Sequence, residues 1–329
     1  MRPLLLLTCA LMSANAMATE PVPLSVEAKI ALPGVKGRID HLAVDVAQQR
    51  LFVAALGNDS VEVIDLKSRQ RVQSVRGFAE PQGVALLPQA QTLYVASGGD
   101  GSLRTLHLGD LTSGRTIDLG DDADNVRLDR EQHFVYVGYG SGALAVIDAA
   151  KQGKVADIRL EDHPESFQLE TAGPRIFVNV PDANQIAVVD REARKQIASW
   201  PTQDLHANFA MALDERNQRL LVSFRRPAML GVFNLSDGKE LARIETGDDV
   251  DDVFLDQKRN RVYVACGEGF VDVLAERESG YARVGRLPTS PGARTAVFSA
   301  ELDKLFVAAR ANGSEPATVW VLGFSIHRN

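Results

Sequence analysis

Seven copies of one short motif recur along this chain of 329 residues at a nearly constant spacing. Each copy is four residues long, ends in valine and has an aromatic residue or leucine in third place. Successive copies are 41–44 residues apart and begin at Arg50, Thr92, Phe134, Arg175, Arg219, Arg261 and Lys304. A period of about 40–45 residues built from strand-like units is typical of a β-propeller. The sequence therefore predicts an all-β fold, a seven-bladed β-propeller.

Each repeat unit reads as four strands separated by polar turns. An inner strand such as His41–Asp45 comes first, and the motif strand follows it. A loop rich in Gly, Asn, Asp and Ser leads to a third strand such as Val61–Asp65, and a charged turn leads to a polar fourth strand. Apolar and polar residues alternate with a period of two, which indicates strands rather than helices. Four-stranded blades are therefore expected.

The seventh unit lacks a fourth strand in its own part of the sequence. Residues 26–34 resemble the fourth strand at residues 282–288. We therefore expect the ring to be closed by this N-terminal strand pairing with the last blade, which removes a free sheet edge.

The first 18 residues resemble a signal peptide. Arg2 precedes an apolar stretch, and Ala16-Met17-Ala18 fits a cleavage site. We expect residues 1–18 to be removed and residues 19–329 to form a single propeller domain, in the periplasm or secreted. A lipobox at Cys9 is the less favoured alternative. Without Cys9, the mature chain would keep Cys266 alone and form no internal disulfide, and we expect a monomer.

Charge and hydropathy exclude two classes of partner. The formal net charge is −7, whereas nucleic-acid binding needs a basic surface. No apolar stretch reaches the roughly 20 residues that a membrane-spanning helix needs. We therefore expect a small-molecule or protein partner, with no nucleic acid and no membrane span.

The repeat units RLFVAALGNDSVEVIDL, TLYVASGGDGSLRTLHL and RIFVNVPDANQIAVVD, which begin at Arg50, Thr92 and Arg175, resemble the YVTN-repeat family. The Asn of that family's Tyr-Val-Thr-Asn motif is mostly replaced here by Ala or Gly. The resemblance covers nearly the whole mature chain. It implies an exported seven-bladed propeller of the YncE-like type, and it implies little about function.

Polar residues cluster where each inner strand begins, which in a propeller is one mouth of the central channel. We predict a ligand-binding site there, formed by Asp40, His41, Gln82, Asp124, Asn125, Glu165, Asp251, Asp252 and Arg294. His163 and His206 lie in equivalent segments. Carboxylates and imidazoles suit a divalent cation, for which the candidate ligands are Asp40, His41, Asp124, Glu165, Asp251 and Asp252.

The sequence leaves three interpretations of this mouth open. The first is an exported binding or scaffold protein that uses the mouth for a small ligand, a cation or a protein partner. The second is a metal-assisted hydrolase of the lactonase-like propeller type, with the mouth as its active site. The third is a mouth that is polar only because water fills it. A weaker hypothesis is an anion clamp formed by Arg225, Arg226, Arg294 and Arg310.

Overall fold

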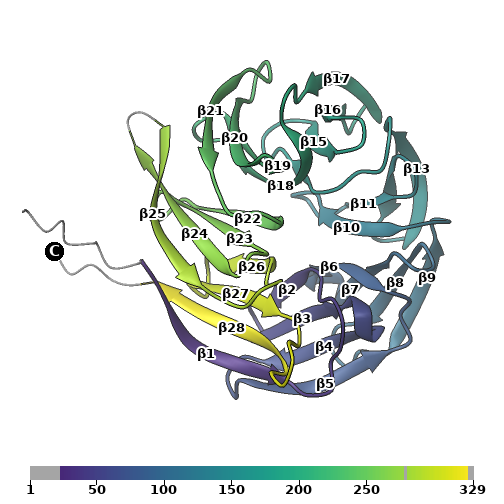
Figure 1. Cartoon of the computed structure of the whole chain (residues 1–329). Helices are drawn as coiled ribbons and strands as arrows, with labels where there is room; N and C mark the ends of the chain where they lie inside the picture. Colours follow the sequence, from purple (N-terminus) through teal and green to yellow (C-terminus); the bar gives the residue numbers. More distant parts are fainter. Residues whose placement is uncertain (1–22, 278–279, 325–329) are drawn as a thin grey trace, which may run out of the picture.

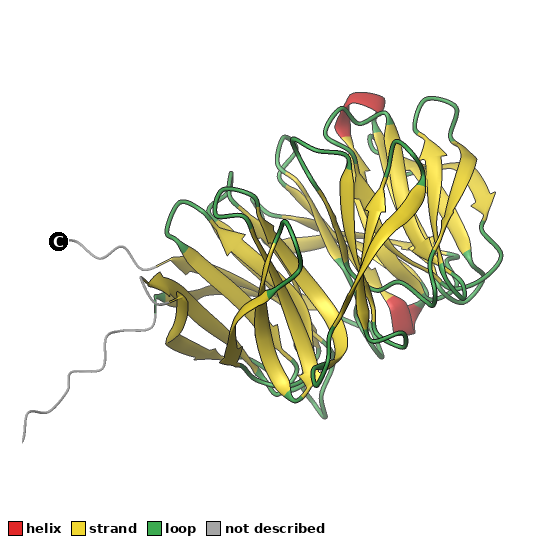
Figure 2. Ribbon diagram, turned by 90° about the horizontal axis from the view of Figure 1, so that it is seen from above, coloured by secondary structure: helices red, strands yellow, loops and turns green. Residues whose placement is uncertain are grey.

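The computed structural model describes residues 23–277 and 280–324. It consists of seven four-stranded antiparallel sheets arranged in a ring around a central channel (Figure 1). Apart from two single-turn 3-10 helices, η1 (Leu56–Asn58) and η2 (Pro88–Ala90), the described residues form strands and loops (Figure 2). No helix of the described residues is long and apolar enough to cross a membrane. The prediction of a seven-bladed β-propeller is confirmed.

The first four blades follow the chain from β2 to β17. Blade 1 contains β2 (Leu42–Asp45), β3 (Arg50–Ala55), β4 (Ser60–Asp65) and β5 (Gln70–Arg76). Blade 2 contains β6 (Pro81–Leu87), β7 (Thr92–Ser97), β8 (Ser102–His107) and β9 (Ser113–Asp118). Blade 3 contains β10 (Ala123–Leu128), β11 (Phe134–Tyr139), β12 (Ala143–Asp148) and β13 (Gly153–Arg159). Blade 4 contains β14 (Phe167–Leu169), β15 (Arg175–Val180), β16 (Gln185–Asp190) and β17 (Lys195–Pro201).

The remaining blades complete the ring. Blade 5 contains β18 (His206–Asp214), β19 (Arg219–Arg226), β20 (Ala228–Asn234) and β21 (Glu240–Glu245). Blade 6 contains β22 (Val250–Asp256), β23 (Arg261–Cys266), β24 (Phe270–Arg277) and β25 (Gly280–Pro288). Blade 7 contains β26 (Thr295–Ser299), β27 (Lys304–Ala309), β28 (Ala317–Phe324) and, as its outer strand, β1 (Leu24–Leu32).

Blade 7 closes the ring as the sequence predicted. Strand β1 pairs antiparallel with β28, from Leu24 opposite Phe324 to Leu32 opposite Ala317 (Figure 1). Leu32 is fully buried and Leu24 and Ile30 are nearly so. The pairing therefore satisfies the backbone of β28 and also adds apolar contacts to the core.

The core is divided among the interfaces between neighbouring blades. Each of the seven interfaces has its own cluster of buried apolar residues. The third residues of the seven motifs are all buried in these clusters, with exposures of 2% or less: Phe52, Tyr94, Tyr136, Phe177, Leu221, Tyr263 and Phe306. Since burying one large apolar side chain contributes about 1.5–3 kcal/mol, the repeated motif is explained by packing between blades.

Two kinds of loop meet on one face of the ring. The loop before an inner strand is hydrogen bonded to the loop that follows the second strand of the same blade. For example, the Gly57 amide donates to the Arg38 carbonyl at 2.9 Å, and the Gly267 amide donates to the Asp249 carbonyl at 3.0 Å. These contacts fix the loops that surround the channel mouth.

Candidate functional site

The predicted mouth residues gather around one cavity of about 220 Å³. Asp252 is the exception, because it lies beside His41 and does not line the cavity. The cavity is lined by Arg38, Asp40, His41, Gln82, Asp122, Asp124, Asn125, His163, Glu165, Ser166, Phe209, Arg225, Asp251 and Arg294. Blades 1 to 7 all contribute, so the site exists only in the closed ring.

Irregular pairing in the inner strands aims several of these side chains. The register of β10 against β11 shifts in the stretch that holds Asp124 and Asn125. The register of β22 against β23 shifts at Asp251, and that of β6 against β7 shifts around Gln82. A bulge turns a side chain away from the regular alternation of a strand. Adjacent residues such as Asp124 and Asn125 can therefore both line the cavity.

Asp251 belongs to an ion-pair network on the blade 5–7 side of the mouth. It contacts the guanidinium of Arg225 and lies 2.5 Å from Nε of Arg294. Asp249 lies 2.5 Å from Nη1 of Arg294 and 3.6 Å from Nη2 of Arg225. The guanidinium carbon of Arg225 also lies 3.6 Å from the ring centre of Phe209. Two arginines and two aspartates thus offset one another's charge, although burial outweighs Arg225 and Arg294 and raises the pKa of Asp251 to about 6.

His41 is surrounded by carboxylates. Its Nε2 lies 3.7 Å from Asp40 and 3.9 Å from Asp124, and its Nδ1 lies 3.8 Å from Asp252. Burial disfavours the charged imidazole, but the three carboxylates outweigh it and raise the pKa of His41 to about 10. His41 is therefore an imidazolium at neutral pH and has no lone pair for a metal.

Asp40 and Asp252 have partners within the fold. Nη2 of Arg38 donates to Oδ2 of Asp40 at 2.8 Å. The backbone amide of Ala296, on blade 7, donates to Oδ2 of Asp252 at 2.8 Å. Asp252 thus links blade 6 to Ala296 of blade 7 and to His41 of blade 1, whereas Arg38 and His41, the partners of Asp40, lie in its own blade.

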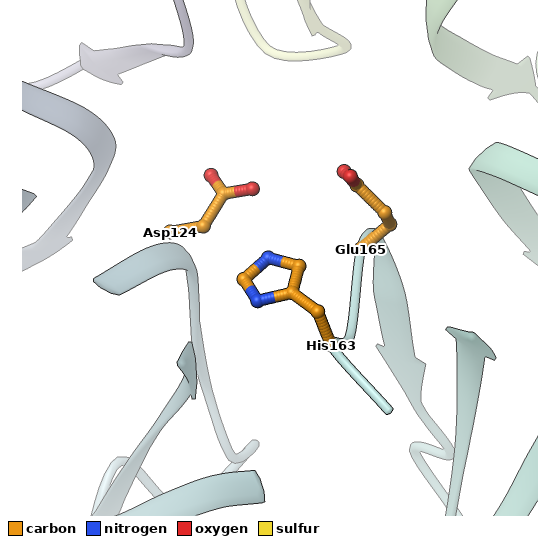
Figure 3. Close-up of side chains that lie close together, drawn as sticks. All are labelled: Asp124, His163 and Glu165. Atoms are coloured by element: carbon orange, nitrogen blue, oxygen red, sulfur yellow. The ribbon is translucent and has the colours of Figure 1, made fainter. Parts of the chain in front are cut away.

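The blade 3–4 side of the mouth holds a different group. One ligand atom from each of Asp124, His163 and Glu165 can be chosen so that all three lie within 4.8 Å of one another. The two carboxyl groups and one ring nitrogen of His163 face a shared space (Figure 3). Carboxylates and one imidazole form a donor set suited to Mn²⁺ or Zn²⁺.

The backbone fixes the tautomer of His163. Its Nδ1 lies 2.6 Å from the carbonyl oxygen of Gly140 and 3.8 Å from a carboxylate oxygen of Asp122. Since a carbonyl oxygen only accepts, Nδ1 must carry the proton. Nε2 of a neutral His163 then keeps its lone pair and is free to bind a metal. A ring N–H bonded to a carbonyl is the usual support of a metal-binding histidine.

Two buried oxygens at this place have no hydrogen-bond partner among the described residues. They are Oδ1 of Asp124, which lies 3.9 Å from Nε2 of His41, and Oδ1 of Asn125. The two residues are 7% and 2% exposed. An unpaired buried acceptor costs free energy, so a donor or a cation at this position would stabilise the fold.

The two carboxyl groups of the cluster ionise with difficulty. Burial, together with the charge of Asp40, raises the pKa of Asp124 to about 6 although His41 opposes the shift. Burial and the charges of Asp124 and Asp251 raise the pKa of Glu165 well above its ordinary value. A bound cation would relieve both effects.

The structure also places residues that the sequence analysis treated differently. His163, grouped by sequence only with the general polar segments, completes the three-residue cluster with Asp124 and Glu165. Gln82 donates to Asp122 at 2.9 Å and so positions a carboxylate. Two residues of the proposed anion clamp do not act as predicted. Arg225 forms an ion pair with Asp251, and Arg226 lines neither this cavity nor the second, smaller cavity described below.

Comparison with known proteins supports the fold and leaves the function open. No protein-family profile and no curated protein sequence matches the chain. Among solved structures it is similar to a chain of Kuenenia stuttgartiensis hydrazine synthase, with a TM-score of 0.76 and 17% identity over 87% of this chain and 97% of that one. It is also similar to a chain of a mitotic checkpoint complex, with a TM-score of 0.76 and 14% identity over 97% and 98%. The chain is thus a seven-bladed β-propeller with a polar channel mouth.

Proposed function

We propose that this protein binds a divalent cation through Asp124, His163 and Glu165, and that the cation helps to hold a small ligand in the channel mouth. The observation that carries this proposal is the hydrogen bond from Nδ1 of His163 to the Gly140 carbonyl. It leaves Nε2 available beside two carboxyl groups, one of which has an unpaired buried oxygen. Asn125 lines the same cavity and has an unpaired oxygen of its own, so we include its amide oxygen as an uncharged candidate ligand.

Charge supports a divalent ion at this place. Three other carboxylates at the mouth, Asp40, Asp251 and Asp252, each have a cationic group nearby. Asp122 has the ring of His163 at 3.8 Å. Neither Asp124 nor Glu165 has an arginine or lysine within 4 Å among the described residues, and Asp124 shares His41 with two other aspartates. The mixed set of imidazole and carboxylates favours Mn²⁺ or Zn²⁺ over Ca²⁺.

Titration calorimetry on the mature protein, stripped of metal with chelator, tests the proposal. We expect Mn²⁺ and Zn²⁺ to bind with one-to-one stoichiometry, and we expect His163→Gln to weaken binding about 10–100-fold. His206→Gln is the matched control, because His206 lies on the same face but contacts Asn184 instead of a carboxylate. Absence of binding, or equal losses in the two variants, would refute the proposal.

A metal-assisted hydrolase of the lactonase-like propeller type is the second candidate function. The raised pKa of Glu165 favours it, because a carboxylate with a raised pKa is a stronger general base than an ordinary one. A panel of lactones and esters, assayed with Mn²⁺ or Zn²⁺ present, separates the two candidates. Turnover that Glu165→Gln abolishes would favour the enzyme, whereas cation binding without turnover would favour the binding protein.

The proposal includes export. The signal-peptide features of residues 1–18, which lie outside the described residues, support cleavage and a mature propeller beginning at Thr19 in the periplasm or outside the cell. The repeat motifs support membership of the YVTN-repeat family. Mass spectrometry of the exported protein gives its N-terminus, and light scattering tests the expected monomer.

A further inference from the structure

A second, smaller cavity adjoins the mouth on its blade 7–1 side. Its volume is about 70 Å³, and Arg38 and Arg294 line both cavities. It is lined by Arg38, Ile39, Asp249, Gly292, Arg294, Ala308 and Arg310. A single small ligand that fills the mouth would therefore reach the basic groups of this cavity.

The small cavity has an excess of positive charge. Three guanidinium groups line it with one carboxylate, that of Asp249. Arg294 is paired with Asp249 and Asp251, and Arg38 with Asp40, so the excess charge is that of Arg310. Among the residues that the structure describes, the Arg38 side chain donates one hydrogen bond, from Nη2 to Asp40, and it is 46% exposed. Arg310 is exposed and has no ion pair among the described residues. Most donors of Arg38 and Arg310 are thus available to an anion.

The backbone makes room for Arg310. Gly292 has a φ of +81 degrees, and a Cβ built on it would lie 2.6 Å from Nε of Arg310. Its amide is hydrogen bonded to the Gly267 carbonyl at 2.6 Å, which holds the turn in place. A side chain at position 292 would therefore displace the guanidinium from the cavity wall.

We propose that this basic cavity binds an oxyanion group of the ligand, a carboxylate or a phosphate, while another oxygen of the same ligand coordinates the cation held by Asp124, His163 and Glu165. This inference rests on the proposed function and specifies its ligand as a small, oxygen-rich anion. A guanidinium offers paired N–H donors that match both kinds of oxyanion. The cation at one side and the guanidinium groups at the other set the orientation of the ligand.

Binding of two probes to the mature protein tests the inference, with and without Mn²⁺. Succinate represents carboxylates and glycerol phosphate represents phosphates. We expect at least one probe to bind, to bind about tenfold or more tightly when Mn²⁺ is present, and to lose about tenfold or more in affinity in Arg310→Gln. The tighter probe identifies the preferred oxyanion. Arg226→Gln is the matched control, since Arg226 is exposed and lines neither cavity.

Mn²⁺ affinity is measured in the same variants to separate this inference from the proposed function. Normal Mn²⁺ binding with no probe binding, or with equal probe binding in Arg310→Gln and Arg226→Gln, would overturn the inference and leave the cation site intact. Probe binding that needs Arg310 but no Mn²⁺ would support the basic cavity and count against the cation. Gly292→Ala, if it folds, should weaken the probe in the same way without removing a charge.

Discussion

The two sides of the channel mouth use the same residue types in opposite ways. On the blade 5–7 side, Asp251 lies between Arg225 and Arg294. On the blade 3–4 side, Asp124 and Glu165 face each other and His163, with no arginine in contact. The first side has two arginines as its own counter-charges, whereas the second has only His41, which it shares with two other aspartates.

The difference shows that the groups in contact with a carboxylate determine whether it stabilises the ligand-free fold or is available to a ligand. A paired aspartate contributes to the scaffold, since removing it leaves a buried positive charge. An unpaired carboxylate costs stability in the ligand-free protein and stores free energy that a ligand recovers. The two sides should therefore respond oppositely to the same substitution.

The largest expected effect follows from Asp251→Asn. It leaves the guanidinium groups of Arg225 and Arg294 with Asp249 alone. Although burial raises the pKa of Asp251 to about 6, the group is ionised at about pH 8, and we expect the loss of its two ion pairs to lower the free energy of unfolding there by about 3 kcal/mol. Asp124→Asn, the matched change on the other side, should leave the metal-free protein equally stable or more stable. Urea unfolding in the presence of chelator measures both, and equal losses in the two variants would remove the distinction between the sides.

The next effect is on cation affinity. Asp124→Asn and Glu165→Gln should each weaken Mn²⁺ binding by about 100-fold, because each removes a charged ligand. Asp40→Asn should weaken it by less than about tenfold, because Asp40 is paired with Arg38 and acts only at a distance. If Asp40→Asn proves as damaging as Asp124→Asn, the ligands include residues of the paired side.

The smallest effect is the pH dependence. Because the pKa of Asp124 is near 6 and that of Glu165 is raised, protons compete with the cation, and Mn²⁺ affinity should fall about tenfold between about pH 7 and pH 5. An affinity that is constant over this range would show that neither carboxyl group is a ligand.

The contribution of Asp124 to the stability of the metal-free protein should change with pH in the opposite direction to Mn²⁺ affinity, and rise as the pH falls. A carboxyl group whose pKa is raised by folding contributes stability below its ordinary pKa and loses it as the pH rises through about 6. The stability advantage of Asp124→Asn over the wild type should therefore shrink as the pH falls from about 7 to 5. Thermal melts of the two proteins with chelator check this, and a constant difference would contradict the raised pKa.

The fold followed from the sequence because its signals are local and repeated. The motif period gave seven blades, and the resemblance between residues 26–34 and a fourth strand gave the pairing of β1 with β28. Position along each repeat also located the mouth, since the residues that precede or begin the inner strands line it. The repeat period and the position of a residue within its repeat can both be read from one sequence.

Which mouth residues are charged and which keep a free ligand atom depends on contacts between blades. The sequence does not show these contacts. His41 and His163 both precede an inner strand, yet the three carboxylates around His41 keep it charged while the Gly140 carbonyl keeps a lone pair free on His163. The register shift that lets both Asp124 and Asn125 line the cavity depends on how β10 pairs with β11, which the sequence alone does not specify. Partners from other blades thus decide each role.

The pairing of β1 with β28 has a consequence for the order in which the protein is made. Nearly 300 residues separate Leu24 from its partner Phe324, so the earliest strand has to wait, unpaired, until the latest one is synthesised. Contacts this distant in sequence form slowly. The delay would favour the export proposed here, because an unfolded chain can be translocated across a membrane before the last blade closes the ring.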